Sequence, residues 1–574
     1  MIEWKGSLSL VCAFPDAGCL VDLQGCHSGR RGPSSCPESA TGEVLLSNTS
    51  SSLTSFLPWF LPEWVGFEGS STQATMATFL VSNQQELEDA LATSSLNNQK
   101  NTIVLDATFG DQTLTDGPLV YSGDTTLSII GNGSTITQSD PQADVFVANG
   151  GGDVSIANLS IEGGYRGIGI DVPADETGTV TVTLTDVDVS GTFYHGVHVD
   201  DQTNGSAASV VLNLNNSVID GNGAVGDNSD GLGVGDSISD SDGVRVDEGG
   251  AGNATVNISS SVITNNGADG LEIDERGSGS VFLAVSDSNF EGNGFWDSED
   301  VDDGIDVDEA DAGSIQVAIE STTISNNFDE GLDLDEAGSG DVSVEAQGVT
   351  LSGNGDEGLK VTEEDGGDVS AALEGLLVED NGEEGIMLEE FGDGSVEAGI
   401  VISVVGRNGK EGVDIEEEGL GDVRFGADGL TASDNSDEGI EVTEDGEGDL
   451  ITGLRSIVAA GNGNSGIFLE QLGGGTLRAR GRDILTENNG EDGIRLFSGG
   501  PIVPSNGVET GGLYAAFRSF SSNGNAGVSI NVEEGAGSLT LRDASFSGNF
   551  VDNDPTFPST VTVAMINTFI DTTV

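Results

Sequence analysis

The sequence has few of the residues that build a compact core or a nucleic-acid surface. Only 5% of its 574 residues are aromatic, and 18 Lys and Arg stand against 98 Asp and Glu, for a formal net charge of −80. Phosphate binding needs a positive surface, so this balance argues against a nucleic-acid partner. The sequence also lacks an apolar run of the about 18 residues that a membrane helix requires, so no transmembrane segment is expected.

Cysteine is absent after Cys36, and all four cysteines lie in the first 75 residues at gaps of 7, 7 and 10. These gaps match no zinc-site spacing, so we expect no metal site there. Residues 1–30 also lack the continuous apolar stretch of a secretory signal. The composition changes near Met76. We therefore expect a poorly ordered N-terminal extension over residues 1–75, with Met76 as an alternative start.

A strand and a capping helix are predicted directly after Met76, over residues 76–102. Phe79 to Val81 form a short apolar strand, and Leu87, Ala90 and Leu91 fall on one face of a helix over 84–93. Asn83 and Glu86 fit a capping box at the start of this helix. Such a helix would cover the open end of a repeat protein, which otherwise exposes unpaired strand edges.

A glycine that opens an alternating strand recurs along the rest of the chain, and we use it as the anchor of each repeat. The anchors are Gly243, Gly270, Gly304, Gly331, Gly358, Gly385, Gly412, Gly439, Gly466, Gly493 and Gly527, with weaker copies at Gly167 and Gly196. From Gly304 to Gly493 every step is 27 residues. Insertions over 223–240, 295–303 and 498–512 explain the longer steps.

An asparagine stands four residues before most anchors. The set is Asn266, Asn327, Asn354, Asn381, Asn408, Asn435, Asn462, Asn489 and Asn523, with Asn222 and Asn293 in interrupted repeats. Such a column can hydrogen-bond from copy to copy and satisfy the backbone of a turn. Together with the S-x-N-G turn at Ser352 to Gly355, it resembles the pectate lyase-like superfamily. The resemblance implies a right-handed parallel β-helix over 103–550, with 551–574 as a C-terminal tail or cap, but no particular activity.

Acidic residues form columns in register with the anchors, and we expect them to point outward. Glu248, Glu275, Glu309, Glu336, Glu363, Glu390, Glu417 and Glu444 stand five residues after the anchor, and Asp247, Asp274, Asp308 and Asp335 stand four after it. A further acidic column, Asp242 to Glu438, immediately precedes the anchors. Stacked rungs would bring like charges about 4.8 Å apart. Calcium, which prefers carboxylate oxygens, would offset this repulsion.

A solvated acidic coat, as in a salt-adapted protein, is the alternative to calcium binding, although a coat needs no register between repeats. The nonapeptide calcium repeat of RTX-type proteins does not explain the columns either. Only residues 249–257 approach that motif, and Ala254 stands where it requires Asp.

Two further sets of residues are candidates for a glycan site. His198 shares a column with Arg245, beside carboxylates, and a base and a guanidinium are the groups needed to abstract a proton next to a uronate carboxyl group. A basic patch, consisting of Arg455, Arg478, Arg480, Arg482 and Arg495, could hold an anionic sugar chain or pair with neighbouring acids.

These features predict an extracellular or cell-surface β-helix that binds Ca²⁺ and has a structural or adhesive role, with a polysaccharide or cell-surface glycan as a partner. The alternative is a polysaccharide lyase or epimerase acting on a polyuronide.

Overall fold

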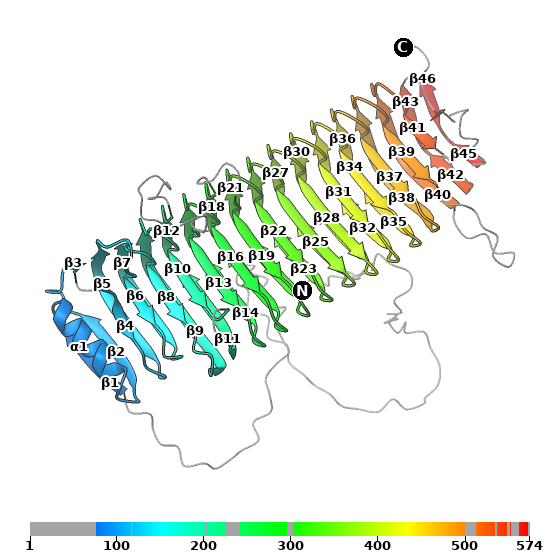
Figure 1. The fold of residues 1–574 in the computed structure, drawn as a ribbon. Helices are drawn as coiled ribbons and strands as arrows, with labels where there is room; N and C mark the ends of the chain where they lie inside the picture. The colour runs from blue at the N-terminus through cyan, green and yellow to red at the C-terminus, as the bar shows by residue number, and fades with distance from the viewer. Residues whose placement is uncertain are drawn as a thin grey trace, which may run out of the picture. The chain divides into compact units, whose positions relative to one another are not determined.

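The computed structural model describes residues 76–571, except 116, 203–204, 224–240, 295–301, 500–511, 534–536, 548–550 and 553–561. The predicted extension over 1–75, most of the 223–240 insertion and part of the C-terminal tail therefore lie outside the described residues. The described chain winds into a parallel β-solenoid with its strands stacked along one axis (Figure 1). The predicted right-handed β-helix is confirmed.

The N-terminal end is covered by a helix, as predicted. Strand β1 (Met76–Val81) leads into α1 (Gln84–Ser94), whose buried face includes Leu87, Ala90 and Leu91 (Figure 1). The Asn83 side chain caps the helix by accepting a hydrogen bond from the Glu86 amide at 3.1 Å. Glu86 itself accepts a hydrogen bond from the Ser82 amide rather than from the Asn83 amide.

The part of the chain that the structure describes contains no helix with the length and hydrophobicity of a membrane span.

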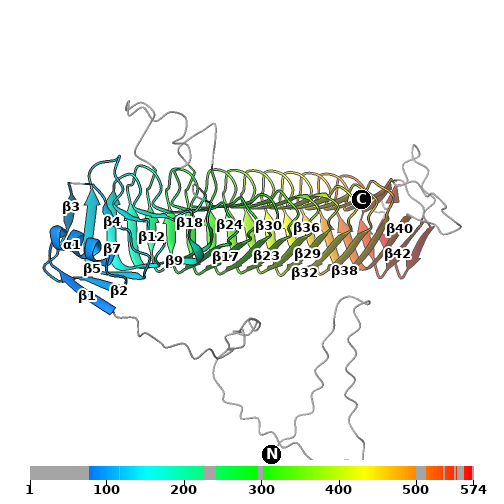
Figure 2. The ribbon, with the colours of Figure 1, turned by 60° about the horizontal axis from the view of Figure 1, so that its bottom comes forward.

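Each full rung contributes a long strand and a short strand to one sheet and a third strand to another. In one rung these are β23 (Val342–Gln347), β24 (Thr350–Ser352) and β25 (Leu359–Asp365). We call the sheet of long and short strands sheet A and the sheet of third strands sheet B (Figure 2). Neighbouring strands are parallel and 27 residues apart in the regular region, as in the pairing of Leu332 with Leu359.

The strands of sheet B carry the anchors at their start. They are β4 (Leu119–Tyr121), β6 (Phe146–Ala148), β8 (Ile168–Asp171), β10 (Val197–Asp200), β13 (Val244–Glu248), β16 (Leu271–Glu275), β19 (Ile305–Glu309), β22 (Leu332–Glu336), β25, β28 (Ile386–Gly392), β31 (Val413–Glu417), β34 (Ile440–Glu444), β37 (Ile467–Gln471), β39 (Ile494–Ser498), β41 (Ile530–Glu533) and β44 (Val551–Asp552).

Sheet A has two rows of strands. The long ones are β1, β2 (Lys100–Leu105), β5 (Leu127–Gln138), β7 (Val154–Gly163), β9 (Thr177–Ser190), β11 (Ala207–Asn215), β14 (Ala254–Ser259), β17 (Val281–Ser286), β20 (Ile315–Glu320), β23, β26 (Val369–Glu374), β29 (Val396–Val401), β32 (Val423–Asp428), β35 (Leu450–Arg455), β38 (Thr476–Glu487), β40 (Gly512–Asn523), β42 (Gly537–Arg542) and β45 (Thr562–Ile566). The short ones are β3 (Gln112–Leu114), β12 (Val218–Asp220), β15 (Val262–Thr264), β18 (Asn289–Glu291), β21 (Thr323–Ser325), β24, β27 (Leu377–Glu379), β30 (Val404–Gly406), β33 (Thr431–Ser433), β36 (Val458–Ala460), β43 (Ser545–Ser547) and β46 (Phe569–Asp571).

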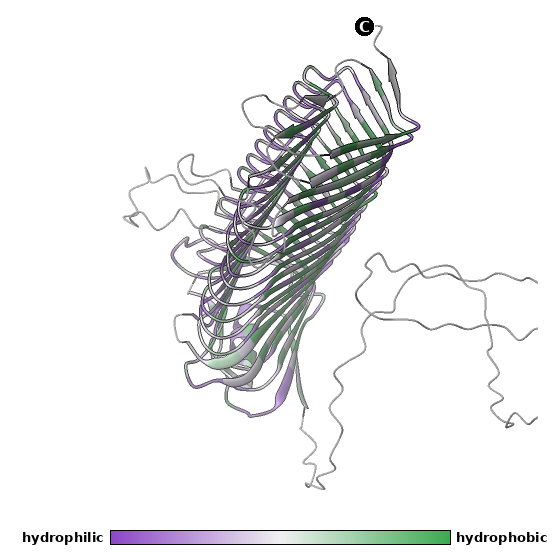
Figure 3. Ribbon diagram, turned by 90° about the vertical axis from the view of Figure 1, so that its right-hand side faces the viewer, coloured by the Kyte–Doolittle hydropathy of each residue, from purple (hydrophilic) through white to green (hydrophobic). Residues whose placement is uncertain are grey.

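The core follows from the alternation of side chains along each strand. In β20, Ile315, Val317 and Ile319 are buried and the residues between them are exposed, so the apolar side chains of this strand face the interior. Hydrophobic residues lie on the strands along the length of the solenoid (Figure 3). Glycine is required where turns of successive rungs touch. A Cβ on Gly340 would lie 1.4 Å from the backbone oxygen of Gly313, so no larger residue fits there without a shift of the turn.

The asparagine column is confirmed as a buried ladder. The Asn354 side-chain amide donates to Asn381 Oδ1 at 3.0 Å, and the same bond recurs from Asn222 to Asn489. The final predicted member is wrong. Asn489 donates to Asn525, not to Asn523, because Ile494 pairs with Ile530 and places Ser529 rather than Gly527 at the anchor position.

Candidate metal centre

The glutamate column five residues after the anchor lies inside the solenoid, which corrects the expectation that it points outward. Its members are Glu248, Glu275, Glu309, Glu336, Glu363, Glu390, Glu417 and Glu444, each at most 1% exposed. Side chains alternate along a strand, so a residue five after the anchor shares the inner face with the apolar residues one and three after it. Leu332, Leu334 and Glu336 of β22 show this parity.

Each glutamate of this ladder uses one oxygen to hold a turn. Glu336 Oε1 accepts from the Gly340 amide at 2.9 Å, and the equivalent bond recurs for the other members from Glu275 to Glu444. From Glu275 to Glu417 the second oxygen, Oε2, is buried and accepts no hydrogen bond from an N–H or O–H group of the described chain. Neighbouring carboxyl groups of the ladder lie close enough to raise one another's pKa. Two ionised carboxylates repel each other, so a proton or a cation between them would relieve this repulsion.

Burial and the neighbouring carboxyl groups raise the pKa of several ladder members. The pKa of Glu275 rises to about 9, and those of Glu336 and Glu417 rise to about 8. The ladder ends on a neutral side chain, because Gln471 takes the next position and its amide donates to Glu444 Oε2. The raised pKa values favour protonated carboxyl groups at Glu275, Glu336 and Glu417 at neutral pH.

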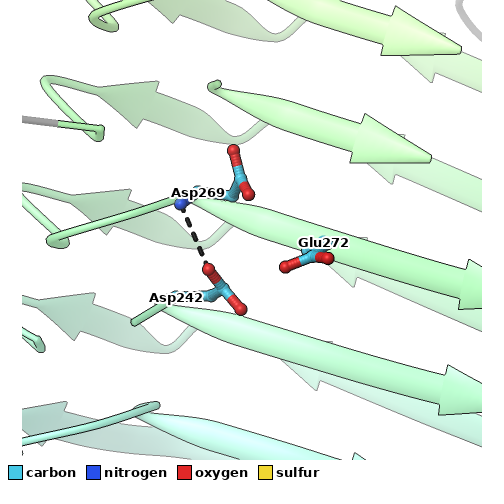
Figure 4. A group of neighbouring side chains, drawn as sticks. All are labelled: Asp242, Asp269 and Glu272. Atoms are coloured by element: carbon cyan, nitrogen blue, oxygen red, sulfur yellow. Dashed lines mark hydrogen bonds between the residues drawn. The ribbon is translucent and has the colours of Figure 1, made fainter. Parts of the chain in front are cut away.

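The outer acidic clusters lie where the turn enters sheet B. In each cluster, the acidic residue just before an anchor lies near an acidic residue two positions after an anchor, or near the acidic residue that precedes it in the turn. The carboxylate oxygens of one cluster all lie within 4.8 Å of one another. The groups include Asp242–Asp269–Glu272, Asp303–Asp306–Asp333, Asp303–Asp329–Glu330, Glu330–Asp356–Glu357 and Glu357–Glu383–Glu384. Figure 4 shows the first, with the Asp269 amide donating to Asp242 Oδ1 at 3.2 Å.

Basic side chains of the described residues contact some members of these clusters but not Asp303 or Asp306. Arg245 contacts the first cluster through Asp242 and Glu272. Lys360 contacts Glu330 at 2.9 Å and Asp333 Oδ2 at 2.7 Å. Asp303 and Asp306 form no ion pair with any basic residue in the described part of the chain.

The Asp303–Asp306–Asp333 cluster is therefore a candidate site for a cation. Asp333 is 7% exposed, and its Oδ1 is buried without a hydrogen-bond partner. Burial, followed by repulsion from neighbouring acids that include Asp269, Asp308 and Asp335, raises the pKa values of Asp303 and Asp306 well above their ordinary range and that of Asp333 to about 8. Charge that is this costly to hold is what a divalent ion would neutralise.

The predicted metal residues four after the anchor divide into two pairs. Asp247 and Asp274 are engaged by Arg245, each at 2.8 Å. Asp308 and Asp335 are half-buried on the outer face of sheet B. Burial and the charges of Asp274 and Asp335 raise the pKa of Asp308 to about 6.

The two candidate catalytic residues converge on one carboxylate. His198 Nε2 lies 2.7 Å from Asp247 Oδ2, and Arg245 Nε lies 2.8 Å from Asp247 Oδ1. Burial opposes ionisation of Asp247, but His198 and Arg245 hold its pKa at about 2. Arg245 is 8% exposed and contacts three further carboxylates, those of Asp242, Glu272 and Asp274. This geometry matches a buried ion network more closely than a substrate clamp.

Four of the five predicted binding arginines lie together on sheet A. Arg455 comes from β35, and Arg478, Arg480 and Arg482 from β38, with Arg455 paired in register with Arg482. Arg495 does not join them, since it lies on β39 of sheet B with its guanidinium 4.3 Å from the ring centre of Phe468.

The sequence did not indicate that the acidic residues of the turn lie close to the acidic residues two positions after the anchor. Asp306 and Asp333 were not singled out, although their column could be read from the same anchors. The missing information was the angle between turn and strand, which a one-dimensional period does not contain.

The fold and these clusters define an acidic parallel β-helix. No family model and no curated protein matches the sequence. Solved structures with a similar fold include the periplasmic alginate epimerase AlgG, at 10% identity, covering 85% of this chain and 89% of that one, with a TM-score of 0.26. Another is the A-module of the Azotobacter vinelandii mannuronan C-5 epimerase AlgE4, at 12% identity, 83% and 95% coverage and a TM-score of 0.25. The Dettilon tailspike protein follows at 12% identity, 75% and 64% coverage and a TM-score of 0.28. These similarities concern the fold alone.

Proposed function

We propose that this protein is a calcium-binding β-helix, whose leading site is the Asp303–Asp306–Asp333 cluster on the outer face of sheet B. The observation that carries the proposal is the geometry of this cluster, whose three carboxylates have oxygens within 4.8 Å of one another. Among the described residues no basic side chain pairs with Asp303 or Asp306, and Asp333 has a buried oxygen without a hydrogen-bond partner. Calcium takes six to eight oxygen ligands, so water would complete its shell at the half-buried Asp306.

The interior glutamates suit protons better than calcium. Each Oε1 is already committed to a glycine amide, as in Glu336, which leaves about one oxygen per rung for an ion. That number falls well short of the shell that calcium requires. The calcium role predicted for Glu248 to Glu444 therefore gives way, in this proposal, to a column of shared protons.

A structural or adhesive role outside the cell follows from this chemistry. Extracellular calcium-binding modules operate at Kd values of about 10⁻⁴ to 10⁻³ M. A solenoid whose outer charge is neutralised under those conditions would be rigid there, and it could present its faces to a glycan. The lyase or epimerase alternative requires a guanidinium that is free to bind a uronate, whereas Arg245 is held by four carboxylates.

Calcium is expected to raise the melting temperature above its value in sodium at equal ionic strength. Binding to the native state adds RT ln(1 + [L]/Kd), or about 2.7 kcal/mol per site at a hundredfold excess over Kd. Sodium at the same ionic strength only screens. Identical melting curves would mean that the acids are a solvated coat and would remove calcium from the proposal.

The variant Asp306→Asn locates the site. We expect calorimetric titration with calcium to show at least a tenfold weaker affinity at one site. Unfolding in EDTA should show a more stable protein, because the variant removes the cost of burying a carboxyl group that is ionised in the unfolded chain. Glu364→Gln is the matched control, since Glu364 is exposed on the neighbouring β25 and belongs to no cluster described above. Equal titrations for wild type and Asp306→Asn would move the site elsewhere.

A further inference from the structure

We infer that the protein forms a two-fold symmetric dimer through the outer face of sheet A, with the arginine-rich end of one copy against the acidic end of the other. The surface is made by nine long strands, β20, β23, β26, β29, β32, β35, β38, β40 and β42. The inference is independent of calcium binding, because it concerns a different face of the solenoid.

One column of outward side chains on these strands changes sign along the axis. Read by strand register, it runs Glu320, Gln347, Glu374, Val401, Asp428, Arg455, Arg482, Arg518 and Arg542. Four arginines in successive rungs are unusual in a chain with only 18 basic residues. Glu345, Arg478 and Arg480 on adjacent columns follow the same division.

A two-fold axis in the interface, parallel to the strands and near β32 and β35, makes this column its own complement. Rotation about that axis reverses the solenoid direction but keeps each column opposite itself. The acids of β20 to β26 then face the arginines of β38 to β42 in the second copy. The rung spacing of about 4.8 Å is the same in both copies, so with the axis at β32 Glu320 and Glu374 come opposite Arg542 and Arg482 of the second copy without deformation.

The relief of the face allows close approach. The middle column is Ala372, Gly399, Gly426 and Gly453 at the centre of the proposed interface, so this column adds no side chain larger than a methyl group there. On the acidic half, a groove of about 810 Å³ is lined by residues that include Glu320, Glu345 and Glu374. The groove can receive the long arginine side chains of the second copy.

The arginines are available for such contacts. The side chains of Arg455, Arg482 and Arg518 are 63%, 63% and 59% exposed. Their ion pairs within the chain, with Asp428, Asp483 and Asp543, are surface pairs of the kind that contributes little. Arg480 forms no ion pair within the described part of the chain.

The area is sufficient for a stable dimer. Nine strands span about 38 Å along the axis and six residues span about 20 Å across it, so the face covers about 770 Å² per copy. Stable interfaces of standard size bury about 800 Å² per partner. The net charge opposes approach at long range, but at about 0.1 M salt the screening length is about 10 Å, and local complementarity then dominates.

The test uses two face variants of the full chain in sedimentation velocity experiments. R455E/R482E/R518E reverses the charge of three of the four arginines in the column, and E320R/E345R/E374R reverses the charge of the acids on β20, β23 and β26. All six side chains are exposed, so circular dichroism and melting curves should match those of the wild type. We expect wild type to dimerise and each variant to self-associate at least tenfold more weakly.

Mixing the two variants in equal amounts should restore the dimer as a heterodimer, whatever the precise register. The inference is overturned if wild type stays monomeric at about 0.1 M salt with or without calcium, if either variant dimerises like wild type, or if the mixture remains monomeric. A monomeric wild type that is retained on an immobilised polyuronide, with retention lost in R455E/R482E/R518E, would also overturn it and assign the arginines to a polyanion.

Discussion

Acidification from pH 9 to pH 5 is expected to stabilise the calcium-free protein. Burial, together with neighbouring carboxyl groups, raises the pKa values of Glu275 and Glu357 to about 9 and that of Asp333 to about 8. In the unfolded chain such groups titrate near pH 4. Between these limits the folded state binds more protons than the unfolded state, so the free energy of unfolding falls as pH rises.

The magnitude is large because several groups act together. Each extra proton bound by the folded state contributes about 1.4 kcal/mol per pH unit within the window from about pH 4.5 to pH 9. Urea unfolding in EDTA at several pH values measures the slope directly. Saturating calcium should flatten the slope in part, because it replaces protons at the outer clusters but not in the interior ladder. Stability in EDTA that is flat or rises from pH 5 to pH 9 would contradict the shared-proton description.

Glu336→Gln separates the interior ladder from the outer clusters. Glutamine has the shape of a protonated glutamate, and Gln471 already occupies this position at the end of the ladder. We expect the variant to be more stable than wild type near pH 8 and to keep its calcium response. The pH dependence of its free energy of unfolding should be smaller by the contribution of up to one proton. Glu364→Gln should change neither slope nor stability. A less stable Glu336→Gln near pH 8 would indicate that the ladder holds a cation or a full negative charge.

The fold was predictable because two independent patterns have the same period. The anchor glycines mark where strands of sheet B begin, and the asparagines mark the turn before them, so their joint spacing fixed the rung over most of the chain. The exception is the last anchor. Residues 500–511 carry neither pattern, so sequence could not show that Ser529 and Asn525, rather than Gly527 and Asn523, continue the columns.

The composition of the site was predictable from the period, and the direction of the glutamate column was predictable from strand parity, but the approach of the turn acids to the strand was not. Period alone placed Glu336 in a column with Glu309 and Glu363, which is correct, but strand parity places that column inside with Leu332 and Leu334. Counting parity from the anchor would have found this. The approach of Asp303 to Asp306 depends on how the turn bends into β19, which no period reveals.

Arg245→Met is expected to be among the most destabilising single substitutions in the molecule. The Arg245 guanidinium, 8% exposed, contacts Asp242, Asp247, Glu272 and Asp274. Removing one partner of a buried ion pair costs about 3–5 kcal/mol, because the remaining charge stays buried without compensation, and here four carboxylates lose a partner at once. Methionine preserves much of the side-chain volume, so the loss would be electrostatic rather than a packing defect.

Arg276→Met is the matched control. Arg276 contacts the same Asp274 at 2.9 Å, but its side chain is 55% exposed, so its loss should cost about 0–1 kcal/mol. The loss of stability in Arg245→Met should become smaller as pH falls to about 5, because the carboxylates that no longer contact a guanidinium can then take up protons. Equal stabilities for the two variants at pH 7 would show that the Arg245 network does not support the solenoid, and would return Arg245 to the list of candidates for binding a uronate.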